Sequence, residues 1–251
     1  MANFNTSRNV IVGAAAVYIS RKDSLSVSWN PDDPTVVPVP AGTSGVSLIN
    51  TLDTDSQNTS GTWRNVGYTT NGVEVTYTPT YGEVEVDQLL DTAKMFKEKM
   101  TAMVKTELRE STLENMLLVW AQSKSDFEGL PGSGTYKTYS DDGSGTNTSH
   151  KGFDNVTLAD GDEHLGIAAG ALGLDPVERQ LLFVGPSPRA VTTNKKRERV
   201  YHLRRVLSVS ATTHGLKRSD ATSLPVEFRL LPANVSGSEY GSIRDRIITT
   251  S

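Results

Sequence analysis

The residue types that most often carry catalysis or bind metal are few in this chain and lie far apart. The sequence has four histidines: His150, His164, His202 and His214. No two of them are three or four residues apart, so no helix presents a pair of imidazole ligands to a metal ion. The sequence has no cysteine, which excludes thiolate nucleophiles and thiolate zinc sites. We expect neither a metal site nor a cofactor.

Two motifs approach a known chemistry without completing it. Residues 160–164 read Asp-Gly-Asp-Glu-His, but they lack the spaced oxygen ligands of a calcium loop, and we interpret them as a solvated acidic turn. Gly129 and Gly134 are spaced like the start of a phosphate-binding loop, yet Thr135 stands where that loop needs a lysine. No Gly-x-Ser-x-Gly motif occurs, so the sequence offers no nucleophile elbow. We therefore do not expect an enzyme.

One basic cluster stands out near the end of the chain. It comprises Lys195, Lys196, Arg197 and Arg199, with Arg204 and Arg205 beyond it. Such a cluster either contacts phosphates or belongs to a solvated or interacting surface. No aromatic residues alternate with the cations, as a single-strand nucleic-acid site requires. We therefore interpret the cluster as a solvated loop or a candidate patch between subunits.

Composition and charge limit the class of protein. The chain has 251 residues, of which 36% are hydrophobic, and its formal net charge is −4. That length suits one large β domain or two small ones, and we expect a single domain. A protein that grips DNA usually carries a basic excess, which is absent here. The lack of cysteine favours a reducing compartment. The apolar run at residues 10–19 is too short to span a bilayer.

Alternating and β-branched segments predict a β-rich domain. The expected strands are residues 9–20, 180–184, 200–209 and 225–231. Two further alternating runs, 73–77 and 83–87, flank Pro79-Thr80-Tyr81-Gly82. A proline and a glycine between two such runs are typical of a turn, so we predict a hairpin here.

One helix is predicted, and one segment is ambiguous. Ser111 and Glu114 have the spacing of a capping box, and apolar residues follow at helical intervals. These features predict a helix over about 111–122. Residues 94–109 fit either an amphipathic helix or a strand, and their composition slightly favours the helix.

Three polar stretches predict long loops. Residues 21–62 contain Pro31, Pro34, Pro38 and Pro40, which exclude a long helix or a central strand. Residues 123–175 hold clusters of Gly, Ser, Asp and Thr, and residues 235–251 read as a C-terminal arm. Loops of this length are often functional.

Several short segments follow one another in an order that is typical of one family. Segment 61–73 contains a Gly-Tyr turn, 83–88 alternates and ends in Asp-Gln, and 108–115 leads into a Thr-x-Glu-Asn helix start. Segments 12–18, 223–229 and 231–232 resemble the first and closing strands of the same proteins. In this order the segments resemble the major tail tube proteins of long-tailed, siphovirus-type bacteriophages. The resemblance covers about half of the chain.

The resemblance implies two packed antiparallel sheets, a β-sandwich or split barrel, with one flanking helix. It also implies that 94–109 is a strand. Members of the family form hexameric rings that stack into a tube, and their inner sheets merge into a barrel around the channel. Implied partners are further copies of the chain, the tape-measure protein and tail-end proteins. Double-stranded DNA passes through the lumen without specific binding. The implied location is the virion tail, after assembly in the host cytoplasm, with no membrane contact.

Site residues follow from this expectation. An acidic channel wall would not retain DNA, so we predict that Glu83, Glu85 and Asp87 face the lumen while Val84 and Val86 face the core. An ordinary outer solvent face is the alternative, since alternation does not say which face is outside. The predicted core or interface anchors are Trp63, Tyr68, Trp120 and Phe228.

Three other functions remain alternatives. The first is a β-sandwich that decorates virions, binds carbohydrate or mediates adhesion, for which an exposed aromatic platform is expected. The second is a β-rich hydrolase, because a Ser/His/Asp triad is defined in space and not by sequence order. The third is the tube subunit of a contractile injection machine.

Overall fold

The computed structural model describes residues 15–25, 29–33, 47–57, 62–84, 94–122, 127–128, 164–165, 167, 175–187, 195–210, 215 and 222–249. Within these residues the protein is mainly β, as predicted, and eight strands form one antiparallel sheet. The sheet strands are β1 (Ala16–Ser20), β2 (Trp63–Asn65), β3 (Thr69–Val84), β4 (Lys94–Leu108), β7 (Arg179–Pro186), β8 (Lys195–Ser208), β9 (Leu224–Leu230) and β10 (Gly241–Thr249). The helices are α1 (Leu48–Gln57) and α2 (Leu113–Val119), and β5 (Phe127–Glu128) pairs separately with β6 (His164–Leu165).

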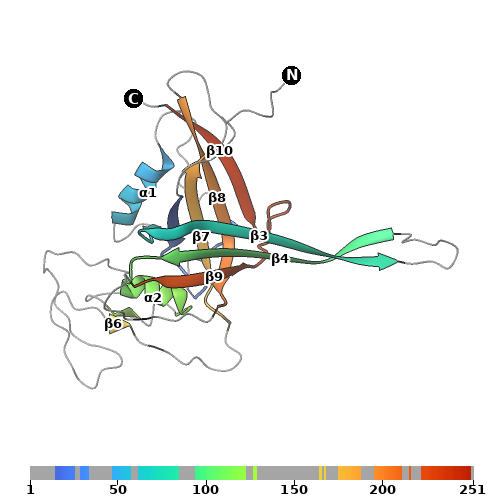
Figure 1. Ribbon diagram of the computed structural model, residues 1–251, viewed down its shortest axis with the longest axis horizontal. Coiled ribbons are helices and arrows are strands. Elements are labelled where there is room, and N and C mark those ends of the chain that lie inside the picture. The colour runs from blue at the N-terminus through green and yellow to red at the C-terminus, as the bar shows by residue number, and fades with distance from the viewer. Residues whose placement is uncertain are drawn as a thin grey trace, which may run out of the picture.

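The sheet bends at β8, because two strands share one of its sides. The strand order is β2-β1-β7-β8-β9-β4-β3, with β10 also paired to β8. β10 pairs with the first part of β8, from Lys195 to Leu203, and β9 pairs with the last part, from Val206 to Ser208. Consequently β3, β4 and β9 run across the direction of β7, β8 and β10 (Figure 1).

The larger core lies on the inner side of this bend. Apolar side chains from β1, β7 and β8 meet those from β4 and β9, and α2 closes the cluster. Its fully buried members include Val17, Leu108, Leu181, Leu224, Val226 and Phe228. Alternate residues of each strand supply this cluster, as period-2 geometry requires. A smaller cluster lies on the opposite side of the sheet under α1 and contains Tyr18, Leu48, Leu52, Trp63, Leu182, Val184 and Val200.

Most of the predicted strands are present. Residues 94–109 form β4, so the strand expected from the family resemblance is confirmed against the mild helix propensity. Ala102 and Val104 of β4 pack in the larger core, which shows tertiary packing overriding a weak local preference. The predictions at 180–184, 200–209 and 225–231 match β7, β8 and β9. Of the predicted strand 9–20, the structure describes β1 from Ala16 onward.

The predicted hairpin turn at Pro79–Gly82 is wrong. β3 runs without interruption from Thr69 to Val84 and pairs along its length with β4. Proline is tolerated there because β3 is the edge strand of the described sheet. Pro79 has no backbone N–H to donate, and no hydrogen bond between strands is lost where that position faces the open side. In place of a turn, the pairing of β3 with β4 has a register shift between Thr80 and Tyr81.

The predicted helix is shorter than 111–122 and starts one residue later than the capping box implies. Thr112 is the N-cap, and its side chain accepts a hydrogen bond from the backbone N–H of Asn115 at 3.3 Å. Trp120 is the C-cap, and Ala121 follows with a φ of 54°. The left-handed backbone at Ala121 ends the helix.

Two of the predicted loops contain regular structure. Region 21–62 includes α1, whose Leu48 and Leu52 are fully buried. Region 235–251 includes β10, which is part of the main sheet and not a free arm. Of region 123–175, only 127–128, 164–165, 167 and 175 lie within the described residues.

Candidate assembly surface on the β3–β4 arm and the β10 edge

The outer parts of β3 and β4 project from the body of the protein as a two-stranded arm (Figure 1). β4 pairs with β9 only from Met103 to Leu108. Towards Lys94 it pairs with β3 alone among the described strands. β3 is the last strand in the sheet order, so its outer side has no strand partner within the described residues. We call residues 74–84 and 94–102 the arm.

One face of the arm continues the core face of the sheet. Residues that stand opposite each other in an antiparallel pair share a face, and Val75 is paired with Val104 while Tyr77 is paired with Ala102. Val104 and Ala102 are buried in the core, whereas Val75 is 46% exposed and Tyr77 is 59% exposed. The Nζ atom of Lys97 lies 5.8 Å from the centre of the Tyr77 ring, over its face. The core face therefore extends outward as an apolar row that no described part of the chain covers.

The other face of the arm is polar along its inner part. Four exposed residues alternate along it: Glu74, Thr76, Thr78 and Thr80. Further out, the Phe96 ring lies across Gly82, where a Cβ atom would come within 2.6 Å of the ring. An aromatic ring over a strand glycine covers backbone that would otherwise be exposed. The arm is thus a formed two-stranded ribbon whose second face is polar near the body and carries an exposed aromatic ring further out.

β10 provides a second open edge. It pairs with β8 alone among the described strands, and its Ile243 is 66% exposed. Ile243 is opposite Tyr201, whose ring stacks on Phe183 at 4.5 Å between centroids. Phe183 belongs to the larger core. Ile243 and Ile247 therefore extend the same core face at the other end of the sheet.

A bidentate ion pair joins β10 to β8. The Arg199 Nε and Nη2 atoms donate to the two carboxylate oxygens of Asp245 at 2.7 and 2.9 Å. The hydrogen bonds from Arg199 hold the pKa of Asp245 below its ordinary value, and Asp245 raises the pKa of Arg199 in return. Asp245 is therefore an anion already neutralised within its own chain.

The opposite side of the β8–β10 ladder is anchored to α1. The Glu198 carboxylate accepts hydrogen bonds from the backbone N–H of Leu48 at 3.0 Å and the hydroxyl of Ser47 at 2.8 Å. It also accepts one from Arg246 Nη1 at 2.5 Å. An anion at a helix N-terminus satisfies free N–H groups and complements the helix dipole. β8, β10 and α1 thus form one unit behind the open edge.

His202 lies buried in the same unit, in contact with Trp63 from β2. Their ring centroids are 6.1 Å apart in an edge-to-face arrangement. Burial lowers the pKa of His202 to about 4, and the nearby charge of Arg204 acts in the same direction. His202 is therefore neutral near pH 7 and acts as a core residue.

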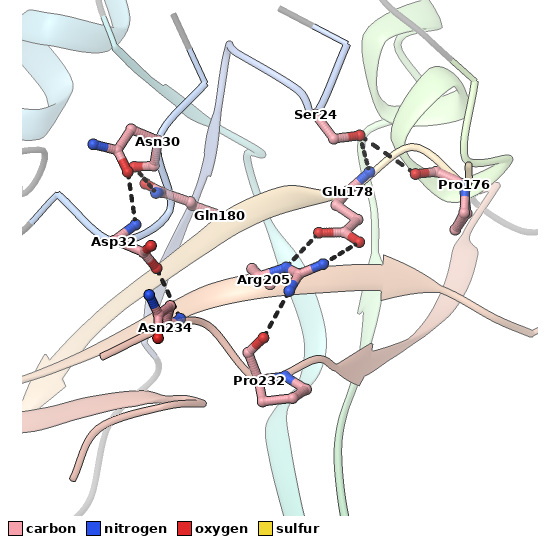
Figure 2. A network of polar contacts seen from close by, with 9 residues as sticks. All are labelled: Ser24, Asn30, Asp32, Pro176, Glu178, Gln180, Arg205, Pro232 and Asn234. Atoms are coloured by element: carbon pink, nitrogen blue, oxygen red, sulfur yellow. Dashed lines mark hydrogen bonds and ion pairs between the residues drawn. The ribbon is translucent and has the colours of Figure 1, made fainter. Parts of the chain in front are cut away.

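A polar network connects Arg205, near the end of β8, with segments next to β7 and β9 (Figure 2). The guanidinium of Arg205 donates to both carboxylate oxygens of Glu178 at 2.6 and 2.7 Å and to the Pro232 carbonyl at 2.7 Å. Asp32 accepts from the Asn234 backbone N–H at 3.0 Å. These bonds tie residues 29–33, β7, β8 and the segment after β9 together. The network thus cross-links segments that are far apart in the sequence.

A groove of about 510 Å³ lies beside the start of β3. Its lining includes Ala16, Ile49, Tyr68 and Glu110, and Tyr68 is 81% exposed. The Glu110 carboxylate accepts the Tyr68 backbone N–H at 3.0 Å. It fills the space where a Cβ of Gly67 would stand. The local fold therefore holds Tyr68 outward at the rim of the groove.

The predicted anchors divide into two groups. Trp63 and Phe228 are buried, at 0% and 2% exposure, and Trp120 is half-buried against the larger core. Tyr68 is exposed, so the core role proposed for it is wrong and a surface role remains.

The predicted lumen residues lie at the outer end of the arm. Glu83 is exposed, but Val84 is 41% exposed, so the expectation that Val84 packs in the core is wrong for the single chain. Glu85, Val86 and Asp87 lie outside the described residues.

The predicted basic patch maps to the start of β8. Lys195 is its first residue, Lys196 is exposed and Arg197 is half-buried. Arg199 pairs with Asp245 of its own chain. Sequence reasoning missed the β10 edge, although apolar residues at 243, 247 and 248 gave a weak signal.

Two negative findings apply to the described residues alone. Within them, no group of three or more His, Asp or Glu side chains has the arrangement of a metal site. None of their helices is long and apolar enough to cross a bilayer. The comparisons with known proteins add no assignment, since no protein-family model and no curated protein matches the sequence significantly.

Proposed function

We propose that this protein is the tube-forming subunit of a long-tailed bacteriophage tail, acting by self-assembly and not by catalysis. One observation carries the proposal: a two-stranded arm projects from the body with an open edge and an uncovered apolar row containing Val75, Tyr77 and Tyr81. Monomeric proteins rarely leave such a surface uncovered, and an unpaired strand edge readily adds another strand.

In the proposed assembly, each chain supplies two open edges that its neighbours complete. A head-to-tail contact that closes after a fixed rotation gives a ring, and a second contact along the axis gives a stack. We infer six chains in a ring, as in the tail tube proteins that the sequence resembles. The two packed sheets of that family would then be completed between chains.

The proposed tube carries double-stranded DNA through its lumen without binding it specifically. The formal net charge of −4 supports this, because an acidic wall does not retain phosphates. Glu83, Glu85 and Asp87 stay candidate lumen residues. The tape-measure protein and tail-end proteins are the proposed partners, and the virion tail is the proposed location.

Negative-stain electron microscopy of the purified protein tests the proposal. We expect rings or tubes of uniform diameter at micromolar to millimolar concentration. A sample that remains strictly monomeric across that range would overturn it. Limited proteolysis of the monomer and the tube gives a second test. α1 already packs on the sheet of the single chain, so we expect the part of region 21–62 outside α1 to be cut less in the tube, and equal cleavage in both states would count against the proposal.

A second function has one observation in its favour. Tyr68 is 81% exposed at the rim of the 510 Å³ groove, which gives the aromatic platform expected of a carbohydrate-binding or adhesion module. Titration with a panel of oligosaccharides, followed by Tyr fluorescence, tests this function. Saturable binding by a monomer that is lost in Tyr68→Ala would support it. A lack of binding across the panel would count against it.

A further inference from the structure

A small cavity lies inside the body of the protein, between α2 and the strands β1, β2 and β7. Its volume is about 10 Å³, which is close to the space that one water molecule needs. Apolar side chains form part of its wall, and the polar part consists of Ser20, Arg21, Arg64, Glu114 and Arg179. All five of these polar residues are buried. The cavity therefore brings together buried charges from distant parts of the sequence.

Glu114 supplies the carboxylate of this wall. Thr112 is the N-cap of α2, so Glu114 stands two residues after the cap and not at the third position, from which a capping-box carboxylate bonds back to the cap. Glu114 is instead buried, at 5% exposure, and its Oε1 atom has no hydrogen-bond partner among the described residues. Burying a carboxylate oxygen without a hydrogen bond is costly, and such atoms are rare in native proteins. A partner from outside the chain is therefore expected at Glu114.

Guanidinium groups supply the hydrogen-bond donors of the wall. Arg64 donates from Nη2 to Asn115 Oδ1 at 2.7 Å, and Arg179 donates from Nη2 to the Gln122 carbonyl at 3.0 Å. A guanidinium carries five N–H donors, so one such bond uses only part of its capacity. The wall thus places donors and an acceptor around the same small space.

The charges around the cavity limit what it holds. Arg179 Nη2 lies 3.7 Å from Asp23 Oδ2, so one cation of the wall has a counter-ion within the chain. The three arginines of the wall still outnumber the two carboxylates of Asp23 and Glu114, and this excess would repel a metal cation. A halide ion carries no proton to donate to Glu114. Water both donates and accepts hydrogen bonds, and it fits the volume.

We propose that this cavity binds one ordered water molecule, which donates a hydrogen bond to Glu114 Oε1 and accepts one from a guanidinium of the wall. Buried waters typically bridge polar groups in this way, and a bridging water is nearly as favourable as a direct hydrogen bond. The bound water links α2 to the strands around it. The inference concerns the interior of a single chain, and it holds whether or not the chain assembles.

An experimental structure at a resolution that shows ordered water tests the proposal, either from crystals of the single chain or from assembled protein. We expect one density peak at about 2.6–3.2 Å from both Glu114 Oε1 and a guanidinium nitrogen of Arg21, Arg64 or Arg179. A cavity without density would overturn the proposal. A direct hydrogen bond from a guanidinium to Glu114 Oε1, with no water between them, would overturn it as well.

Variants separate the acceptor from the shape of the cavity. Glu114→Gln keeps a side-chain oxygen that accepts hydrogen bonds, so the water should remain, whereas Glu114→Met offers only a weakly accepting sulfur, so the water should be lost. Leu118→Met changes the apolar wall to the same residue type and is the matched control, in which the water should remain because no polar partner is removed. A water retained in Glu114→Met would contradict the role given to Glu114. If Glu114→Met does not fold, the wild-type structure alone still decides the proposal.

Discussion

Glu198 on β8 and Arg246 on β10 form a buried ion pair, with Arg246 Nη1 2.5 Å from Glu198 Oε1 and the side chains only 5% and 7% exposed. The same carboxylate caps the N-terminus of α1 through Leu48 and Ser47. A single carboxylate therefore joins three elements from distant parts of the sequence. It fixes β10, whose outer side has no strand partner among the described residues, to β8 and α1.

Removing this charge should weaken the fold. In Glu198→Gln, Arg246 keeps its buried charge without a counter-ion, and the helix loses an anionic cap. Breaking one partner of a buried pair typically costs about 3 kcal/mol or more, so we expect a loss of that size in urea unfolding. Glu74→Gln removes an exposed carboxylate and serves as the control, with an expected change within about 0.5 kcal/mol. Equal stability of the two variants would contradict the role given to Glu198.

The burial of His202 predicts a loss of stability in acid. Burial lowers the pKa of His202 from its ordinary value of 6.5 to about 4 in the folded protein, so the unfolded chain binds the proton first as pH falls. The stabilisation is complete above about pH 6.5 and is lost between pH 6.5 and 4. This shift corresponds to about 3 kcal/mol. Urea unfolding of the wild type and His202→Phe at pH 7, 5.5 and 4.5 measures it, and parallel pH dependence of the two proteins would contradict the assignment.

The exposed aromatic row of the arm should matter for assembly and not for folding. Tyr77 is 59% exposed, so Tyr77→Ser removes little buried area from the monomer and should change its stability by less than about 1 kcal/mol. We expect assembly to require at least about tenfold more protein, because an apolar side chain is lost from the interface. Thr78→Ser on the polar face is the matched control. Light scattering against concentration compares them, and unchanged assembly of Tyr77→Ser would remove the arm from the interface.

Gly67 and Gly72 both have a positive φ, but only at Gly67 would an added Cβ atom also collide with another residue. Gly67 has a φ of +82°, and its missing Cβ would lie 2.0 Å from the Glu110 carboxyl carbon, whereas Gly72 has a φ of +70° with nothing within 4 Å. Gly72→Ala should therefore cost about 1 kcal/mol from backbone strain alone. Gly67→Ala should cost more, because Glu110 must also release the Tyr68 N–H. Thermal unfolding of the two variants checks the order, and a smaller effect at Gly67 would contradict the described geometry.

The segment around Pro79 shows where sequence reasoning fails. A Pro-x-x-Gly stretch between two alternating runs favours a turn on local grounds. A strand forms there instead of a turn, because β4 pairs with nearly the whole of β3. The other side of β3 has no described strand partner, so the missing N–H of Pro79 costs no hydrogen bond on that side. Pro79 lies opposite Met100, which is outside the segment from which the turn was predicted, so the local pattern could not contain this pairing.

α1 was missed for a related reason. Its sequence, Leu-Ile-Asn-Thr-Leu-Asp-Thr-Asp-Ser-Gln, is mostly polar and lies in a region of loop-like composition. Glu198 caps the helix, and Leu48 and Leu52 are buried under it against the sheet. Tertiary contacts supply most of the stability of such a short helix.

By itself, the sequence determined the mainly β class, the positions of β7, β8 and β9 and the existence of α2. It left residues 94–109, which form β4, open between helix and strand, and it left Trp63 and Phe228 open between core and interface. Alternation and helix-start residues carry that information locally, because they reflect which side of each element is apolar. Only the tertiary structure decided that Val75 and Tyr77 lie uncovered while Val104 and Ala102 are buried beside them. Alternation assigns a residue to a face, but whether another element covers that face depends on how distant strands are arranged.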